Sequence, residues 1–276
     1  MKTIFMCPPN HFDVNYVINP WMEGNCHKVN QQQAFEQWGK LNLVLKQAGA
    51  RVINLATPPI DCPDAVFTAN AGLLYKGKFI PSYFKFLERA NEEGYFIQEM
   101  SGHNFQLAGM NITGNRSEQS FEGAGDTLYD RSKDILWFGF GFRTEIGFKK
   151  ILEEALAEFT TVVKQLELVD PRFYHLDTCF CPLDDGNLIW FPDAFSQNSQ
   201  YMIRSIYPNS IRVEENDAIK FACNAVSIGK TIVMPEISMK LFDQLSSLGY
   251  KVEQVNMSQY MRSGGACKCL TIEAIV

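Results

Sequence analysis

One cysteine near the end of the sequence has the setting expected of a nucleophile. Cys269 follows the stretch 263–266 (Ser-Gly-Gly-Ala), and glycines let a backbone bend and approach a bound molecule closely. A thiol beyond such a turn is a candidate to attack an electrophilic carbon, because its surroundings can favour the reactive thiolate. Cysteine is also a common small apolar residue of buried strands, so the residue type alone does not decide between the two interpretations.

Two further groups could move protons. His175 and Asp177 are separated by one residue, and in a strand such positions share a face, so the carboxylate could hold the imidazole in one tautomer. Glu122 lies in a glycine-rich stretch that precedes an apolar hairpin pattern. A lone histidine is more often structural than catalytic, and an acid between glycines is more often part of a surface turn. Whether either residue is catalytic therefore depends on which side chains surround it.

The cysteines allow one competing interpretation. Cys179 with Cys181, and Cys267 with Cys269, form two Cys-x-Cys pairs, and His175 precedes the first of them. Structural zinc sites more often use Cys-x-x-Cys spacing, and cysteines two positions apart on a strand share one face in any case. We therefore expect neither a metal nor any other cofactor.

The polar candidates belong to a repeat. Five stretches share a polar residue after small or apolar neighbours and then an apolar run, and in four of them a short turn and a second apolar run follow. Apolar runs joined by such turns are typical of β-hairpins. With Asn19 added before the first, the polar positions recur every 45 to 56 residues, which indicates repeated supersecondary units. The five positions are Asn70, Asp126, Asp177, Asn224 and Cys269.

Helical patterns separate the hairpins. Apolar residues at three- and four-residue steps predict helices over 31–48, 84–93, 145–165 and 238–248, and short strands follow several of them. One such unit cannot bury its helix alone, but five units around an axis can. We therefore expect an α/β fold, namely a five-bladed pseudosymmetric α/β propeller of strand-hairpin-helix-strand units, in a single domain over residues 1–276. The repeated polar residues would then meet in a central pocket.

Composition narrows the class of partner. The chain has 276 residues, a formal net charge of −6 and no basic cluster, so nothing indicates nucleic acid as a partner. No apolar run has the length of a membrane span, and the first residues have a strand pattern instead of that of a signal peptide. Most of the eight cysteines lie in apolar runs, which favours reduced thiols in a cytoplasmic protein.

In order along the chain, these pieces resemble the guanidino-group-modifying superfamily, which includes arginine deiminase, dimethylarginine dimethylaminohydrolase, amidinotransferase and arginine dihydrolase. The resemblance covers the whole chain, and its motifs are weak singly but specific as an ordered set. They are the stretches 7–9 (Cys-Pro-Pro), 17–22 (Val-Ile-Asn-Pro-Trp-Met), 63–70 (Pro-Asp-Ala-Val-Phe-Thr-Ala-Asn), 122–126, 141–144 (Gly-Phe-Arg-Thr), 175–178 (His-Leu-Asp-Thr) and 264–271. The family fold, a five-bladed α/β propeller, agrees with the repeat.

The resemblance implies a role for each catalytic candidate. Cys269 matches the family's nucleophile, whereas Cys267 lies two residues too early. His175 matches the general acid and base, and Glu122 matches the acid that supports this histidine. Carboxylates that hold the substrate guanidinium are matched by Asp64 and Asp177.

The resemblance also concerns the rest of the substrate. Arg89 and Arg143 match arginines that bind the substrate carboxylate, and Asn19 lies in an Asn-Pro-Trp-Met stretch that arginine dihydrolases share. Deiminases and dimethylarginine hydrolases usually carry aspartate where this chain has Asn70, whereas arginine dihydrolases have asparagine. An amide can bind a neutral ureido group, so a citrulline-like intermediate could stay for a second attack. We therefore expect Asn19 and Asn70 among the substrate-binding residues.

The resulting expectation is a metal-independent hydrolase that forms a cysteine thiouronium intermediate, an arginine dihydrolase giving ornithine, carbon dioxide and ammonia. Dimethylarginine dimethylaminohydrolase and arginine deiminase, which both give citrulline, are the alternatives among enzymes. A non-catalytic arginine-binding sensor is an alternative of another class. The expected partner is a small molecule, arginine or methylated arginine, and the sequence leaves a homo-oligomer open.

Overall fold

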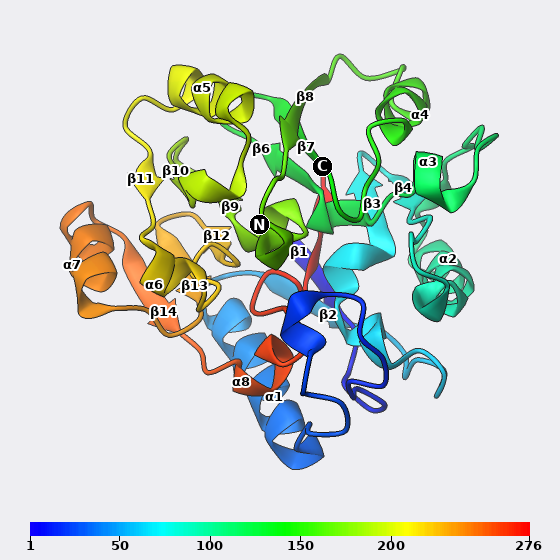
Figure 1. Cartoon of the computed structure of the whole chain (residues 1–276), viewed down its shortest axis with the longest axis horizontal. Coiled ribbons are helices and arrows are strands. Elements are labelled where there is room, and N and C mark those ends of the chain that lie inside the picture. Colours follow the sequence, from blue (N-terminus) through cyan, green and yellow to red (C-terminus); the bar gives the residue numbers. More distant parts are fainter.

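The structure, a computed structural model, describes residues 1–276 and has a mixed α/β fold (Figure 1). No helix is both long and apolar enough to cross a lipid bilayer. The helices are α1 (Gln31–Gln47), α2 (Asn91–Gly102), α3 (Arg116–Gln119), α4 (Phe148–Ala155), α5 (Gln197–Ile206), α6 (Glu215–Ala218), α7 (Met239–Ser247) and α8 (Ser258–Met261). The strands are β1 (Thr3–Met6), β2 (Arg51–Asn54), β3 (Gly72–Tyr75), β4 (Lys78–Pro81), β5 (Gln106–Leu107), β6 (Thr127–Asp130), β7 (Ile135–Phe140), β8 (Val162–Glu167), β9 (Phe180–Pro182), β10 (Leu188–Trp190), β11 (Ile211–Arg212), β12 (Val226–Ile228), β13 (Thr231–Met234), β14 (Lys251–Gln254) and β15 (Ile272–Ile275).

One pattern of strand pairing occurs five times. Two strands pair antiparallel, and the second of them pairs in parallel with a third strand. The five units are β3-β4-β5, β6-β7-β8, β9-β10-β11, β12-β13-β14 and β15-β1-β2. The helices α2, α4, α5, α7 and α1 precede the third strands of these units, respectively. In Figure 1 these helices lie around the outside of the molecule and the strands lie toward its middle.

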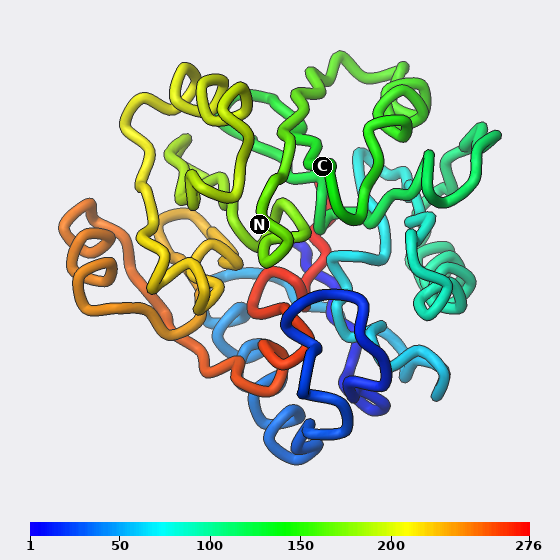
Figure 2. Tube along the Cα trace, viewed as in Figure 1, coloured from blue at the N-terminus to red at the C-terminus, as the bar shows by residue number.

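The first and last strands of the chain meet in one sheet. β15 pairs antiparallel with β1, where Ala274 lies opposite Thr3, and in parallel with β3, where Ala274 lies opposite Leu74. This pairing joins two units into the six-stranded sheet β2-β1-β15-β3-β4-β5. Figure 2 shows the last segment, in red, running into the middle of the molecule beside the first strand, in blue.

The expected elements agree in part with the observed ones. The hairpins after Asn70, Asp126, Asp177 and Asn224 are confirmed, and the helices over 31–48 and 238–248 are confirmed to within a residue at either end. The other two helix predictions were wrong. α2 starts at Asn91, because the residues before it form an irregular segment with a 3₁₀ turn at Leu87–Arg89. α4 ends at Ala155. Of the apolar residues read as its continuation, Leu156 and Phe159 lie in the turn that follows, and Val162 and Val163 belong to β8, which pairs along β7. Helix α5 was not predicted.

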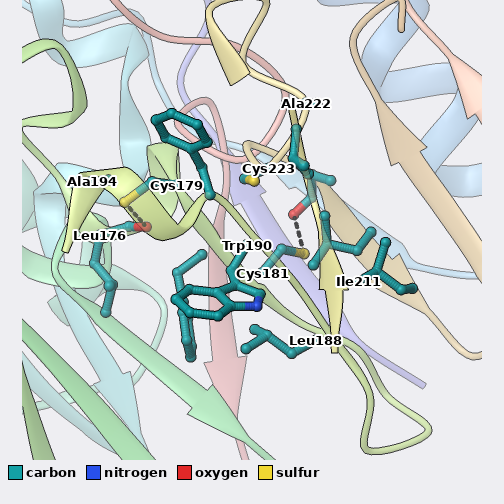
Figure 3. Close-up of a cluster of buried hydrophobic side chains, with 14 of the residues drawn as sticks. Leu176, Cys179, Cys181, Leu188, Trp190, Ala194, Ile211, Ala222 and Cys223 are labelled. Carbon is teal, nitrogen blue, oxygen red and sulfur yellow. Dashed lines mark hydrogen bonds between the residues drawn. The ribbon is translucent and has the colours of Figure 1, made fainter. Parts of the chain in front are cut away.

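The largest apolar cluster fills the space between three of the units, those of β6, β9 and β12. Figure 3 shows part of it around Trp190, which is fully buried. Cys179, Cys181 and Cys223 pack in this cluster as small apolar residues, and none of the eight cysteines forms a disulfide. The thiol of Cys179 donates to the Leu176 carbonyl at 3.6 Å. The first Cys-x-Cys pair is therefore part of the core.

Two glycines bring two functional turns into backbone contact. Gly123 has φ +61, and a Cβ built there would lie 2.6 Å from the backbone nitrogen and oxygen of Gly72. Gly72 begins β3, two residues after Asn70, and Gly123 follows Glu122. The absence of side chains at this crossing therefore sets how closely Asn70 and Glu122 approach.

We predict that Gly123→Ala destabilises the protein more than Gly77→Ala does. Both glycines have positive φ, but a Cβ at Gly77 meets no atom within 4 Å, whereas one at Gly123 meets the backbone of Gly72. The two variants share the conformational strain, and overpacking adds about 1–3 kcal/mol at Gly123 alone. Urea unfolding of the two variants measures the difference. Equal free energies of unfolding would show that the two turns move apart without cost.

Candidate active site

One small cavity collects most of the predicted site residues. Its walls come from loops and 3₁₀ turns before and after the hairpins and not from the strands themselves. The lining residues are Ile18, Asn19, Met22, Asp64, Phe67, Asn70, Arg89, Arg143, Tyr174, His175, Ser263 and Cys269. Of the predicted residues, only Glu122 and Asp177 are absent from this wall, and each contacts a residue that lines it.

Cys269 lies in the turn that leads into β15 and is 3% exposed. Its thiol faces two polar side chains from different units. The Asn224 amide donates to Sγ at 3.0 Å, and the thiol donates to the Asp177 carboxylate, with Sγ 3.3 Å from Oδ2. Burial and the nearby negative charge of Asp177 raise the pKa of Cys269 above its usual range. The resting side chain is therefore a thiol, and the site must change before it becomes a thiolate.

Asp177 lies in a 3₁₀ turn (Leu176–Thr178) and is fully buried. Burial raises the pKa of its carboxyl to about 7, although Lys268 and the hydrogen bonds from Cys269 and Asn224 favour the ionised form. No lysine, arginine or histidine side chain forms a salt bridge with this carboxylate. A bound cation would supply the paired positive charge that Asp177 lacks.

His175 is oriented by Glu122. The imidazole Nε2 lies 2.8 Å from Glu122 Oε2, and the same oxygen accepts from Arg143 Nη1 at 2.9 Å. Burial opposes ionisation of Glu122, but the charges of Arg143 and His175 outweigh it and hold its pKa below the usual range. Because an ionised carboxylate only accepts, Nε2 carries a proton and Nδ1 is the nitrogen free to exchange one in the neutral imidazole.

One expectation about this histidine was wrong. His175 and Asp177 were placed in one strand, with the carboxylate holding the imidazole. They instead flank the start of a 3₁₀ turn, where residues two apart do not share a face, and Asp177 contacts Cys269. The carboxylate that orients the imidazole is Glu122, as the family resemblance implied.

Asn70 is held in one orientation by Arg89. The guanidinium Nη1 donates to Asn70 Oδ1 at 2.8 Å, and the rest of this buried guanidinium forms two hydrogen bonds to Glu92 and one to the Asp64 carbonyl. The amide nitrogen Nδ2 therefore points the other way, 3.4 Å from the Glu122 carbonyl and 3.5 Å from His175 Nδ1. The amide is fixed in this orientation, because a flipped amide would turn its N–H groups toward Arg89, which has no acceptor to offer.

Asp64 and Arg143 both line the cavity, and each has its own partners. Asp64 accepts from the Tyr16 hydroxyl at 2.8 Å and from the Ser263 hydroxyl at 3.2 Å, and its burial raises its pKa despite the charge of Arg89. The Arg143 guanidinium lies against the Tyr174 ring at 4.7 Å from its centroid. Its Nη2 donates to a carbonyl in the loop that carries Asn19.

Asn19 has a local role. Its Oδ1 accepts from the backbone of Trp21 and Met22, and its Nδ2 donates to the Ser263 carbonyl at 3.1 Å. These bonds cap a 3₁₀ turn and tie the loop to the segment before Cys269. The side chain lies in the cavity wall, and direct contact with a substrate stays a prediction for Asn19, as it does for Arg89 and Arg143.

Three contributors were not predicted as site residues. Tyr16 and Ser263, the partners of Asp64, carry no signal in the sequence that separates them from other hydroxyls. Asn224 did carry one, because it occupies a position of the polar repeat. The family resemblance, however, implied a role for Asn19 and Asn70 and none for Asn224.

No group of three or more histidine, cysteine, aspartate or glutamate side chains is arranged to hold a metal ion. The polar groups around Cys269 are hydrogen-bonding partners of its thiol.

The arrangement is one in which a buried thiol, a histidine held by a carboxylate and further carboxylates surround one small cavity in a mixed α/β fold. Residues 8–276 match the profile of the family described as N,N dimethylarginine dimethylhydrolase, eukaryotic, and the chain belongs to that family. The expected resemblance to guanidino-group-modifying proteins is confirmed.

Two curated relatives are similar over nearly the whole chain. The bifunctional arginine dihydrolase/ornithine cyclodeaminase ArgZ of Synechocystis sp. is 44% identical over 98% of this chain, which spans only 37% of the length of that relative. The N(G),N(G)-dimethylarginine dimethylaminohydrolase of Mycobacterium tuberculosis is 35% identical over 97% of this chain and 84% of its own length. Among solved structures, the N-terminal domain of an ArgZ variant covalently bound to a reaction intermediate is similar, with a TM-score of 0.92, 43% identity and coverage of 99% of this chain and 98% of that one.

We predict that Asp177 makes the protein less stable as pH rises. The folded state raises the pKa of this carboxyl to about 7, so between pH 4 and 7 the native state binds more protons than the unfolded state and stability falls with pH. Asp177→Asn removes this dependence. The difference in free energy of unfolding between the variant and the wild type should therefore shift by about 4 kcal/mol in favour of the variant across this range. Urea unfolding at several pH values measures it, and parallel curves would contradict the buried charge.

Proposed function

We propose that this chain is a hydrolase that attacks the guanidino carbon of arginine through Cys269, and that it is an arginine dihydrolase. The observation that carries the proposal is Asn70, whose amide oxygen is bound by Arg89 and whose amide nitrogen faces the catalytic side of the cavity. The similarity to ArgZ, which is named as an arginine dihydrolase, supports the substrate.

The five strand units support a finer description of the fold. In this proposal they are the blades of a pseudosymmetric five-bladed α/β propeller, and residues 1–276 are a single catalytic domain. The polar repeat positions then lie around one axis, which accounts for the contacts between Asn224, Asp177 and Cys269 although they come from three units. We also propose that the protein acts in the cytoplasm, where its free thiols stay reduced.

Binding of arginine would prepare the nucleophile. Asp64 and Asp177 would accept from the guanidinium N–H groups through charge-assisted hydrogen bonds. Once the cation neutralises Asp177, the negative charge that keeps Cys269 protonated is removed, and the cation itself favours the thiolate. Arg89, Arg143 and Asn19 would then contact the amino-acid end of the substrate.

The first hydrolysis uses Cys269 and His175. The thiolate attacks the guanidino carbon and forms a tetrahedral adduct, and the imidazolium gives a proton to the leaving nitrogen, so that ammonia departs and a thiouronium remains. Water then attacks the same carbon and neutral His175 takes one of its protons. The C–S bond breaks as the remaining hydroxyl proton is lost to solvent, giving citrulline and the thiolate. A covalent intermediate in the similar ArgZ domain supports this course.

Asn70 would decide what happens to citrulline. A ureido group has a carbonyl oxygen that needs a donor, and the amide nitrogen of Asn70 can supply one because Arg89 already occupies the amide oxygen. An aspartate at this position has no hydrogen to donate. Retained citrulline is attacked again by Cys269, the second ammonia leaves, and hydrolysis gives a carbamate that breaks down to ornithine and carbon dioxide.

A second candidate function has its own support. The matching family and the Mycobacterium tuberculosis relative carry the name of dimethylarginine dimethylaminohydrolase. That reaction would use the same thiol and histidine but release dimethylamine and stop at citrulline. The substrate that the protein consumes separates the two functions.

We predict that Cys269→Ser lowers turnover of arginine on the order of 10³-fold or more, because a hydroxyl ionises far less readily than a thiol. Binding of arginine should change by no more than a few fold, since Asp64 and Asp177 are untouched. Ammonia release and isothermal calorimetry measure the two quantities. Substantial remaining turnover would mean another nucleophile, with Cys267 the first to test.

We predict that Asn70→Asp shifts the product from ornithine toward citrulline. The introduced carboxylate would pair with Arg89 and bind the guanidinium well, but it offers no donor to the ureido intermediate, which should leave before the second attack. The ammonia yield should fall from about two per arginine toward one. Mass analysis of products measures the ratio.

Asn42→Asp is the matched control for this product ratio. Asn42 is another buried asparagine, and its contacts are Met6 and Asn54, outside the cavity. The control should keep the wild-type ratio. A wild-type protein that stops at citrulline would contradict the dihydrolase proposal, and release of dimethylamine with no reaction of arginine would favour the second candidate.

A further inference from the structure

Asn224 uses every hydrogen-bonding position of its side chain at the nucleophile. Its Oδ1 accepts from the backbone nitrogens of Ala266 and Cys269, both at 3.1 Å. Its Nδ2 donates to the Asp177 carbonyl at 3.0 Å and to Cys269 Sγ at 3.0 Å. The side chain is fully buried, so water does not compete for these bonds.

This network fixes which end of the amide faces the sulfur. Backbone N–H groups only donate, so the group between Ala266 and Cys269 must be the oxygen of Asn224. Nδ2 is then directed at the Asp177 carbonyl and Sγ. The Asn224 amide therefore presents an N–H donor to the reacting atom in every state of the site that keeps these backbone bonds.

Resting on the proposal that Cys269 is the nucleophile, we propose that Asn224 is a further catalytic residue, whose Nδ2–H stabilises the Cys269 thiolate. Asp177 and Asn224 act on the sulfur in opposite directions. A carboxylate accepts the S–H proton and opposes ionisation, whereas an N–H donor binds the thiolate better than the thiol. When a guanidinium neutralises Asp177, the Asn224 donor remains.

The donor would contribute at two steps. It favours the thiolate that attacks the guanidino carbon. When water has added to the thiouronium carbon and His175 has taken the proton of that water, the C–S bond breaks and its electron pair returns to sulfur. A hydrogen bond to the forming thiolate makes the sulfur a better leaving group. Loss of Asn224 should therefore slow release of the covalent intermediate as well as its formation.

Two variants separate the donor from the other roles of the side chain. Asn224→Asp keeps an oxygen for the two backbone N–H groups but replaces the donor with a negative acceptor. Asn224→Leu has similar size, no charge and no donor. Both should raise the pH at which iodoacetamide alkylates Cys269, followed by mass spectrometry of its peptide, and lower kcat about 10- to 100-fold. Rapid acid quenching of the arginine reaction should show that the covalent adduct both forms and decays more slowly than in wild type.

The control is again Asn42→Asp, which also puts a carboxyl group in place of a buried amide. It should lower stability but leave the alkylation profile of Cys269 unchanged. The Asn224 variants would give the same result if the role of Asn224 were only structural. Folded Asn224 variants with a wild-type alkylation profile would overturn the proposal.

If both Asn224 variants misfold, a second measurement tests the proposal on proteins in which Asn224 is unchanged. The side-chain amide protons of Asn224 should shift in NMR spectra when Cys269→Ala removes the sulfur acceptor, and unchanged shifts would overturn the proposal. Neither readout requires turnover. If Cys269→Ser retained activity, the proposed function would fail, while alkylation and NMR would still report on the bond between Asn224 and Cys269.

Discussion

The dominant constraint on this structure is an imbalance of buried charge. Five carboxylates lie buried at or directly behind the cavity, and only two guanidinium groups, those of Arg89 and Arg143, are buried with them. Each guanidinium is already paired, one with Glu92 and the other with Glu122. The five carboxylates are Asp64, Glu92, Glu122, Asp126 and Asp177.

Pairing does not always offset burial: the pKa of Glu92 is raised to about 7 despite its pair with Arg89, and the carboxylates without such a pair respond in the same way. Burial raises the pKa of Asp177 to about 7 and that of Asp126 to about 6, and Asp126 Oδ2 has no hydrogen-bond partner. Keeping them ionised in the fold is costly, since burial removes the water that stabilises their charge. A site of this kind gives up stability in order to attract a cation, and the raised thiol pKa of Cys269 belongs to the same state.

Much of this organisation could be read from the sequence because repetition makes it visible. The hairpins could be predicted because apolar runs and turns recur at a regular spacing, and the residues at the repeat positions do converge. The 3₁₀ turns that carry Asn70 and Asp177 could not be predicted, because a single helical turn leaves no periodic pattern. The segment before α2 was misread for a related reason, since its apolar residues have helical spacing although Leu87–Arg89 form only a 3₁₀ turn before the helix.

The sequence also could not show which side chains bind to each other across the site. Sequence spacing brings His175 and Asp177 together, whereas the folded chain pairs each with a residue about fifty or more positions away. The orientation of Asn70 depends on Arg89, and that of Asn224 on backbone N–H groups next to Cys269. An amide has two chemically different ends, and only its surroundings show which one faces a reacting atom.

The pairing of β15 with β1 has a consequence for when the protein becomes active. Cys269 lies just before β15, and this strand is held between β1 and β3, which are translated more than 190 residues earlier. A ribosome-bound chain that has not yet released residues 272–275 can fold several of its units. It lacks the strand pairing that holds the segment with the Cys269 thiol in place. Cys269 is also the last of the buried polar residues around the cavity in chain order, after the carboxylates, His175 and Asn224. Residues 272–275 therefore decide where Cys269 lies, because the strand that follows it is fixed only by partners from the first third of the chain.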